Sequence, residues 1–267
     1  MKKILFLLII CITATNIFAK QVDIIEVNSP SMNLKVKNVI ILPADYESKT
    51  NLPVLYLLHG YGGNHKSWIQ LKPELPALAT QYGIIIVCPE GKNSWYWDSP
   101  IDRNINYETY VSKELTKYID NNYKTRKDKS GRAISGFSMG GHGGLWLGIR
   151  HQDIFGACGS TSGGVDIRPF PNNWNMKDAL GNYQENSERW NNHTVINQLH
   201  LIKPNLAIII DCGKDDFFYE VNENLHRELI KRNIKHDYIS RPGVHNAQYW
   251  NNAIEFQILF FSRYFYK

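Results

Sequence analysis

Cysteine is scarce in this sequence, with four residues among 267. Cys11 lies in the apolar N-terminal stretch, and the other three are Cys88, Cys158 and Cys212, each inside or beside an apolar run typical of a strand. An odd number of cysteines in such places favours small buried thiols over a disulfide framework. The sequence also lacks Cys-x-x-Cys and the spacings typical of metal ligands. We therefore expect a fold without disulfides and a site without a metal.

An excess of charge of one sign is also lacking. The sequence has 30 Lys and Arg against 25 Asp and Glu, so loss of Lys2 and Lys3 with a cleaved N-terminus would leave a formal charge of +3 (28 − 25). No basic cluster is interleaved with aromatic residues as a nucleic-acid groove requires, so we expect no nucleic-acid partner. No low-complexity linker, internal repeat or Pro/Ser-rich break interrupts the rest. Residues 20–267 are predicted to form one domain.

A long apolar run is missing too, although the N-terminus is apolar. Residues 1–19 combine a basic start, an apolar core over residues 4–12 and a small-residue end at Ala19. This is the pattern of a secretory signal peptide, and the run is too short to span a membrane comfortably. We expect cleavage after Ala19, export to the periplasm or the medium, and no stable membrane insertion afterwards. Ile10 before Cys11 disfavours a lipoprotein, because a small residue is expected there.

What the sequence does contain is a Gly-x-Ser-x-Gly pattern at residues 136–140, between a strand-like run at 132–135 and a glycine-rich helix start. This context predicts a nucleophile elbow with Ser138 as the nucleophile. Only glycine fits easily two residues before and two after the serine, because the turn brings these positions together. The helix N-terminus offers N–H groups to a developing oxyanion. A chance glycine-rich turn is the alternative; Ser160 and Ser162 are rival nucleophiles that lack this strand-to-helix context.

Apolar runs predict the architecture around this elbow. Residues 54–58, 84–89 and 205–210 are continuous apolar runs, typical of parallel strands buried on both faces. Residues 22–43 show the extended patterns of antiparallel strands at a sheet edge. The predicted fold is α/β, an α/β-hydrolase fold with a mostly parallel central sheet and helices on both faces. The irregular segment 165–192 is expected to be a short cap, because irregular segments of this length are usually functional.

A glycine-rich loop, residues 59–63, follows the first buried run. An α/β-hydrolase places half of its oxyanion hole in such a loop, so the backbone amides of Tyr61 and Met139 are predicted to be the two donors. A plain strand-to-helix turn is the alternative. Trp68, in the next helical segment, is predicted to lie either in the core or in the pocket wall.

Aromatic residues gather in the loop after the second buried run, at Trp95 and Trp97. Aromatic clusters in loops are unfavourable to expose and suit a platform for an acyl or sugar group, although they could equally pack on each other. His142, in the elbow helix, flanks the same predicted pocket. We therefore predict four substrate-binding side chains, Trp68, Trp95, Trp97 and His142.

The other catalytic candidates follow the last two predicted strands. Asp215 and Asp216 both lie in the loop after the third buried run and both qualify as the acid, whereas Asp211 is expected within the strand end. His245 lies in the loop between the final strand and a closing helix. The resulting order Ser, Asp, His is that of the α/β-hydrolase triad, in which the histidine removes the serine proton and later protonates the leaving alkoxide. Among the other histidines, His65 is the least excluded.

With these residues in hand, the sequence resembles the esterase D-like group of α/β-hydrolases, which includes S-formylglutathione hydrolases, tributyrin-type carboxylesterases, feruloyl esterases and mycolyltransferases. The resemblance rests on four motifs in the same order, at residues 57–63, 136–141, 211–216 and 243–245. It implies that the acid is the third residue after a glycine, which here is Asp216. It also implies oxyanion donors at the Tyr61 and Met139 amides, and no metal or organic cofactor.

The resemblance implies a serine carboxylic-ester hydrolase that works through an acyl-enzyme. The predicted signal peptide argues against a cytosolic S-formylglutathione role. It favours feruloyl or acetyl esters of plant polysaccharide, or short acyl esters in general, as substrates. Two alternatives remain open: an acyltransferase of the mycolyltransferase type, and a non-catalytic binding protein on a hydrolase scaffold.

Overall fold

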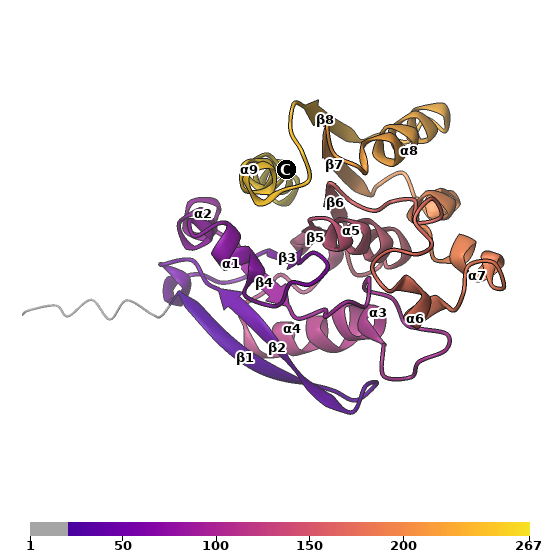
Figure 1. The fold of residues 1–267 in the computed structure, drawn as a ribbon. Helices are drawn as coiled ribbons and strands as arrows, with labels where there is room; N and C mark the ends of the chain where they lie inside the picture. The colour runs from indigo at the N-terminus through magenta and orange to yellow at the C-terminus, as the bar shows by residue number, and fades with distance from the viewer. Residues whose placement is uncertain (1–20) are drawn as a thin grey trace, which may run out of the picture.

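The computed structural model describes residues 21–267, so the predicted signal peptide lies outside the described residues. An eight-stranded sheet in the order β1-β2-β4-β3-β5-β6-β7-β8 forms the centre (Figure 1). The pairs from β4 to β8 are parallel, and β1 and β2 add antiparallel strands at one edge. The predicted mostly parallel sheet is confirmed. The strands are β1 Val22–Ser29, β2 Leu34–Ile41, β3 Val54–Leu58, β4 Ile85–Pro89, β5 Arg132–Gly136, β6 Ala157–Thr161, β7 Ala207–Gly213 and β8 Asp237–Arg241.

Helices cover both faces of the sheet, as predicted. Side chains of β3 alternate between two apolar clusters, with Tyr56 in one and Leu57 in the other, because successive side chains of a strand point to opposite faces. Figure 1 shows α1, α2 and α9 on one side and α4, α5 and α8 on the other. The α-helices are α1 Ser67–Leu71, α2 Leu75–Tyr82, α3 Tyr107–Thr109, α4 Thr116–Asn122, α5 Met139–Arg150, α6 Met176–Leu180, α7 Ser187–Asn192, α8 Tyr219–Lys231 and α9 Ala247–Phe265.

Shorter helical pieces connect these elements. A π-helix, η2 Tyr110–Leu115, joins α3 to α4, and 3-10 turns lie at η1 Tyr46–Ser48, η3 Lys129–Gly131 and η4 Val195–Leu201. Within residues 21–267, no helix has the length and apolar character needed to cross a membrane.

The segment 165–192, predicted to be irregular, contains the short helices α6 and α7. It is anchored by buried apolar side chains, among them Met176, Leu180 and Trp190. The Trp190 indole also donates to the Gly181 carbonyl at 2.9 Å. The segment is thus a folded part of the domain surface rather than a loose loop.

The three cysteines in the described part of the chain are free and buried. Cys88, Cys158 and Cys212 lie in β4, β6 and β7, and burial raises the pKa of each thiol. The prediction of small buried thiols is confirmed.

Candidate active site

Ser138 lies on a sharp turn between β5 and α5, with φ 57° and ψ −120°. This backbone conformation is strained for a residue with a side chain. A Cβ on Gly136 would overlap the Gly140 carbonyl, and a Cβ on Gly140 would overlap the Leu58 carbonyl. The predicted reason for glycine at both places therefore holds, and the turn presents Ser138 at the carboxyl end of the sheet.

Ser138, His245 and Asp216 form one hydrogen-bonded row. His245 Nε2 lies 2.9 Å from Ser138 Oγ, and His245 Nδ1 lies 2.8 Å from Asp216 Oδ2. Because a carboxylate only accepts, Nδ1 carries the proton, which leaves Nε2 free to accept from the serine hydroxyl. The arrangement can therefore take up a proton from Ser138 when its oxygen attacks an electrophile.

The structure brings the predicted acid and base together and separates their rivals from them. Asp216 is 5% exposed and also accepts from the Phe218 amide at 2.8 Å, whereas the side chain of its neighbour Asp215 is exposed. His65 instead pairs with Glu90, at 3.1 Å. The rival nucleophiles Ser160 and Ser162 are buried with no exposed surface.

Two loops that carry the acid and the base are fastened to each other. The Asp215 amide donates to the Gly243 carbonyl at 2.9 Å, and the Lys214 amide donates to the Arg241 carbonyl at 3.0 Å. A Cβ on Gly213 would overlap the Gly243 carbonyl. Main-chain contacts thus hold the loops after β7 and β8 in register.

Asp211 forms hydrogen bonds next to the same two loops. It lies in β7, as predicted, and its buried carboxylate accepts from the Tyr249 hydroxyl and the Arg241 guanidinium, each at 2.5 Å. Burial raises the pKa of Asp211 to about 6, although the hydrogen bond from Tyr249 and the charge of Arg241 oppose this. Spacing along the chain does not predict this role of Asp211, because it does not show that Tyr249 and Arg241 converge on this residue.

The predicted oxyanion donors lie on the two segments that meet at Ser138. A Cβ on Gly60 would lie 3.3 Å from Ser138 Cβ, so the glycine-rich loop passes directly beside the nucleophile. The loop is fastened by the Gly62 amide, which donates to Asn93 Oδ1 at 2.8 Å. Among the hydrogen bonds found within residues 21–267, none uses the backbone amide of Tyr61 or Met139. Both amides are therefore free to donate to a ligand oxygen.

Trp68 lies in the core, not in a pocket wall. Its side chain is 1% exposed, packs edge-on against Phe137 and donates to the Leu58 carbonyl at 2.9 Å. Of the two places predicted for Trp68, the structure shows the first, because the indole covers the sheet face under α1.

Trp95, Trp97 and His142 also differ from the expected binding platform. Trp95 and Trp97 are 1% and 0% exposed and stack on each other with ring centroids 5.6 Å apart. The Trp97 indole donates to His142 Nε2 at 2.8 Å, and His142 Nδ1 donates to the Gly164 carbonyl at 3.0 Å. Burial lowers the pKa of His142 to about 3. These three side chains pack against one another inside the molecule, so their surface is not open to a substrate here.

The aromatic side chain that does reach the surface beside the row is Phe217. It is 52% exposed, and its ring centroid lies 4.1 Å from that of His245. Trp174 stacks on Phe217 at 5.7 Å with an interplanar angle of 24°. Phe217 is not among the four predicted substrate-binding side chains, although its position directly after the predicted acid is a signal that it lies beside the site.

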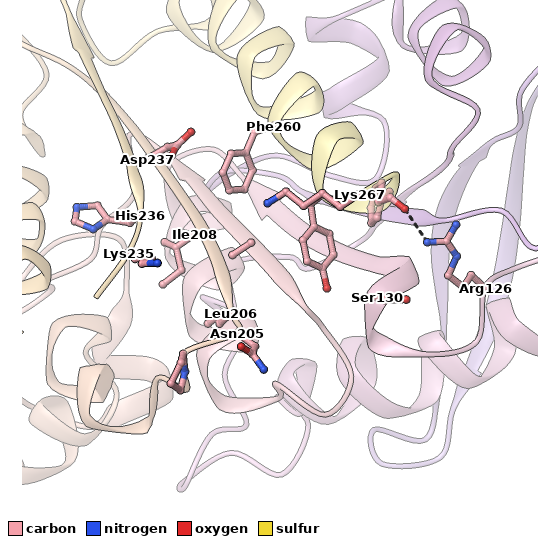
Figure 2. Close-up of a pocket in the computed structure, with 14 residues that line it drawn as sticks. Arg126, Ser130, Asn205, Leu206, Ile208, Lys235, His236, Asp237, Phe260 and Lys267 are labelled. Atoms are coloured by element: carbon pink, nitrogen blue, oxygen red, sulfur yellow. Dashed lines mark hydrogen bonds between the residues drawn. The ribbon is translucent and has the colours of Figure 1, made fainter. Parts of the chain in front are cut away.

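A cavity of about 490 Å³ lies elsewhere, between the start of β7, the start of β8 and the end of α9 (Figure 2). Ala207 and Asp237 line it, and they are the first residues of these two strands. Ser138, Asp216 and His245 instead follow the carboxyl ends of β5, β7 and β8. The cavity therefore lies at the amino ends of the parallel strands, and the hydrogen-bonded row lies at their carboxyl ends. Within residues 21–267, no cluster of His, Cys, Asp and Glu is arranged to hold a metal ion.

A mostly parallel eight-stranded sheet with a serine on its elbow defines an α/β-hydrolase, as predicted. The S-formylglutathione hydrolase of Staphylococcus aureus shares this fold with a TM-score of 0.80, at 22% identity over 90% of this chain and 98% of that one. A solved ferulic acid esterase has a TM-score of 0.78 and 27% identity, over 91% of this chain and 98% of its own.

The family model Esterase, described as "Putative esterase", matches residues 29–260. An acetyl esterase from Caldicellulosiruptor saccharolyticus is 27% identical over 255 residues, which cover 86% of this chain and 95% of that protein. The chain therefore belongs to the Esterase family and is a serine esterase of the carboxylesterase type. The predicted resemblance to the esterase D-like group is confirmed.

Proposed function

We propose that this esterase hydrolyses short acyl or feruloyl esters of carbohydrates, with Ser138 as nucleophile, His245 as general base and Asp216 as the acid that orients the base. The observation that carries the proposal is the hydrogen-bonded row from Ser138 through His245 to Asp216, with His245 contacts of 2.9 and 2.8 Å. The row stands on a strained elbow, where reactive side chains are commonly found.

In the first half of the reaction, Ser138 Oγ attacks the ester carbonyl carbon while its proton moves to His245 Nε2. The carbonyl oxygen becomes an oxyanion that accepts hydrogen bonds from the Tyr61 and Met139 amides. The C–O bond to the alcohol then breaks, and His245 Nε2–H protonates the leaving alkoxide. An acyl group remains on Ser138.

In the second half, water takes the place of the alcohol. His245 Nε2 accepts a proton from the water as its oxygen attacks the acyl carbon, and the same proton returns to Ser138 Oγ when the tetrahedral intermediate collapses. The products are the free acid and the original enzyme. Throughout, Asp216 keeps the other imidazole proton on Nδ1 and stabilises the imidazolium.

The names of two relatives support the substrate class. The acetyl esterase and the ferulic acid esterase are each 27% identical to this chain and align with most of it. The exposed Phe217 beside His245 also supports a substrate with a ring, because exposed aromatic groups next to a reactive centre commonly contact ligands.

Export belongs to the same proposal, because an ester of a polysaccharide is met outside the cytoplasm. The basic and apolar pattern of residues 1–19 supports it. A tagged full-length chain should be recovered outside the cytoplasm with its new N-terminus at Lys20, and a chain that starts at Lys20 behind a Met should stay inside. Equal distribution of the two chains would contradict export.

The test of the function is a substrate panel on residues 20–267, with p-nitrophenyl acetate, p-nitrophenyl butyrate, methyl ferulate and acetylated xylan. We expect release of acetate from xylan or of ferulate, and a loss of at least about 10⁴-fold in kcat for Ser138→Ala. The matched control is Ser162→Ala, a buried rival serine that should keep most of the activity.

Full activity in Ser138→Ala would show that Ser138 is not the nucleophile. Cleavage of only the two p-nitrophenyl esters would contradict the carbohydrate substrates but leave the mechanism standing. Product analysis with an added alcohol separates hydrolysis from acyl transfer, since a transferase would form the new ester in preference to the free acid.

A further inference from the structure

Three aromatic side chains in the described part of the chain are largely exposed, Phe217, Phe256 and Tyr266. Of these, only Phe217 contacts a member of the Ser138–His245–Asp216 row. Its ring lies against the His245 imidazole at an interplanar angle of 37°, with the centroids 4.1 Å apart. Exposing half of a phenyl ring to water is unfavourable, so its place beside the row calls for an explanation.

Trp174 extends the same surface. Its indole is partly exposed and stacks on Phe217 at 24°. The two stacked rings therefore form a partly exposed apolar pair beside His245, which we call the aromatic shelf (Phe217 and Trp174). Trp174 comes from the segment predicted to be a cap, and Phe217 comes from the loop after β7, so the shelf joins two separate parts of the chain.

Buried aromatic side chains hold the two rings of the aromatic shelf in place. Both of its rings contact the buried Phe218, with centroids 4.6 Å from Phe217 and 5.1 Å from Trp174. Trp174 also contacts the buried Trp95 at 5.9 Å. A ring fixed in this way loses little entropy when a ligand binds, which favours recognition.

Trp174 and Asn175 both have left-handed backbone conformations, with φ 48° and φ 50°. Such a conformation is unfavourable for a tryptophan, and strained residues collect at functional sites. With this backbone conformation, the tryptophan of the segment 165–192 meets Phe217. This supports a role for the shelf beyond packing.

The side of the row on which the shelf stands decides which part of a substrate it would meet. His245 Nε2 protonates the leaving alcohol, so the alcohol must lie beside the imidazole. The acyl oxygen lies toward the Tyr61 and Met139 amides. Because the Phe217 ring packs against this imidazole, with the centroids 4.1 Å apart, we place it beside the alcohol part of the ester.

Exposed aromatic rings beside the alcohol suit a sugar ring. One face of a pyranose carries C–H groups that pack on an aromatic ring, while its hydroxyl groups at the ring edge stay in water or find polar partners. Next to Trp174 in the chain, Asn172, Asn173 and Asn175 are exposed, and amide side chains both donate to and accept from hydroxyl groups.

We propose that the aromatic shelf binds the pyranose ring of the leaving alcohol and thereby sets the preference of this esterase for carbohydrate esters. The inference rests on the proposed function, because the side of the leaving alcohol is defined by the role of His245. It assigns to Phe217 and Trp174 a binding role for the sugar and none for the acyl group.

The first experiment compares two acetates that differ only in the alcohol, methyl 2-O-acetyl-β-xylopyranoside and ethyl acetate. The quantity measured is the ratio of kcat/KM for the sugar ester to kcat/KM for ethyl acetate. Phe217→Leu keeps an apolar side chain without a ring face, and we expect it to lower this ratio about 5- to 10-fold, mainly through KM for the sugar ester. Phe217→Tyr restores the ring and should restore the ratio.

The matched control is Tyr266→Leu, which removes an exposed ring far from the row, at the end of α9. It should leave the ratio unchanged. A Phe217→Leu ratio equal to that of the wild type would overturn the proposal, as would an equal fall in kcat/KM for both acetates, because that result would reflect a disturbed His245.

A second experiment does not depend on turnover. Binding of xylotetraose to Ser138→Ala is measured by calorimetry, with and without Phe217→Leu, and Kd is expected to rise about 5- to 10-fold when the ring face is removed. No binding, or an unchanged Kd, would overturn the shelf even if the esterase activity is as proposed. Weakened binding of ferulate instead of xylotetraose would overturn the sugar assignment.

Discussion

The two ends of the parallel strands differ in backbone conformation, in particular in the number of residues with positive φ. Ten residues other than glycine have positive φ in the described chain. Seven of them follow the carboxyl ends of β4, β5 and β6, and these are Lys92, Trp95, Tyr96, Ser138, Ser162, Trp174 and Asn175. The remaining three are Asn33, Asn51 and Asn233, and asparagine adopts this conformation at little cost. Strain is thus concentrated at the end of the sheet where the Ser138–His245–Asp216 row stands.

The opposite end has a cavity but none of this strain on bulky residues. The cavity of about 490 Å³ in Figure 2 is lined by surface side chains such as Arg126, Lys235 and Lys267. Its size reflects the way α9 ends beside β7 and β8. In this molecule, backbone strain and convergent hydrogen bonds mark the site, and the volume of a hollow does not.

The largest difference between the two ends is expected for matched aspartates. Asp216→Asn should lower kcat by about 10³- to 10⁴-fold with little loss of stability, because His245 loses the carboxylate that fixes its tautomer. Asp237→Asn, in the cavity at the other end, should stay within about twofold of the wild type. Steady-state kinetics on p-nitrophenyl acetate measure both. If Asp215→Asn were the inactive variant and Asp216→Asn were active, the assignment of the acid would be wrong.

A smaller effect is expected from His142, which contributes to the pH dependence of the free energy of unfolding. The unfolded chain takes up a proton on this residue below about pH 6.5, whereas burial holds the folded pKa at about 3. Because the unfolded state binds more protons, stability falls as the pH falls from 6.5 toward 3. Between pH 6.5 and 4.5 this loss amounts to about 2 kcal/mol.

His142→Gln keeps a donor and an acceptor but does not titrate, so this part of the pH slope should disappear. Urea unfolding at pH 6.5 and pH 4.5 measures the change. His200→Gln, on an exposed side chain, is the control and should keep the wild-type slope. An unchanged slope in His142→Gln would show that the folded protein admits a proton at this site.

The smallest effect concerns the strain itself. Ser138→Gly and Ser138→Ala both remove the hydroxyl, but only glycine relaxes at φ 57°, so the glycine variant should be more stable by about 1 to 2 kcal/mol. Asn233→Gly, at φ 56°, should differ from the wild type by less than about 0.5 kcal/mol. Equal stability of the two Ser138 variants would mean that the elbow stores no strain.

Sequence reasoning succeeded where a residue's role depends on its neighbours along the chain. Ser138 was recognised from glycines two residues away, and the strands were recognised from continuous apolar runs such as 54–58. The resemblance selects Asp216 over Asp215, and of these two carboxylates it is that of Asp216 that accepts from His245 Nδ1 in the structure. These features are local, so their pattern is complete within a few residues.

Prediction from the sequence fails where a side chain's role depends on contacts with residues far away in the chain. Spacing predicts a binding platform at Trp95 and Trp97, but the Trp97 indole donates to the buried His142, and Trp95 is buried against the rings of Trp97 and His142. Phe217 reaches the surface because the buried volume behind it is filled by Phe218. Which of several aromatic residues is buried depends on three-dimensional volume, and spacing along the chain does not contain that information.

The contact between Ser138 and His245 closes over 107 residues of chain. Helices and the β1–β2 hairpin can form from neighbouring residues, but this contact needs β5 and β8 in place in the sheet, because Ser138 and His245 follow these strands. Contacts of such long sequence separation form slowly, because the entropy of closing the loop is lost before they contribute. In a refolding experiment, recovery of catalytic activity would therefore report the last steps of folding. The far-UV circular dichroism signal of the helices would report the first steps.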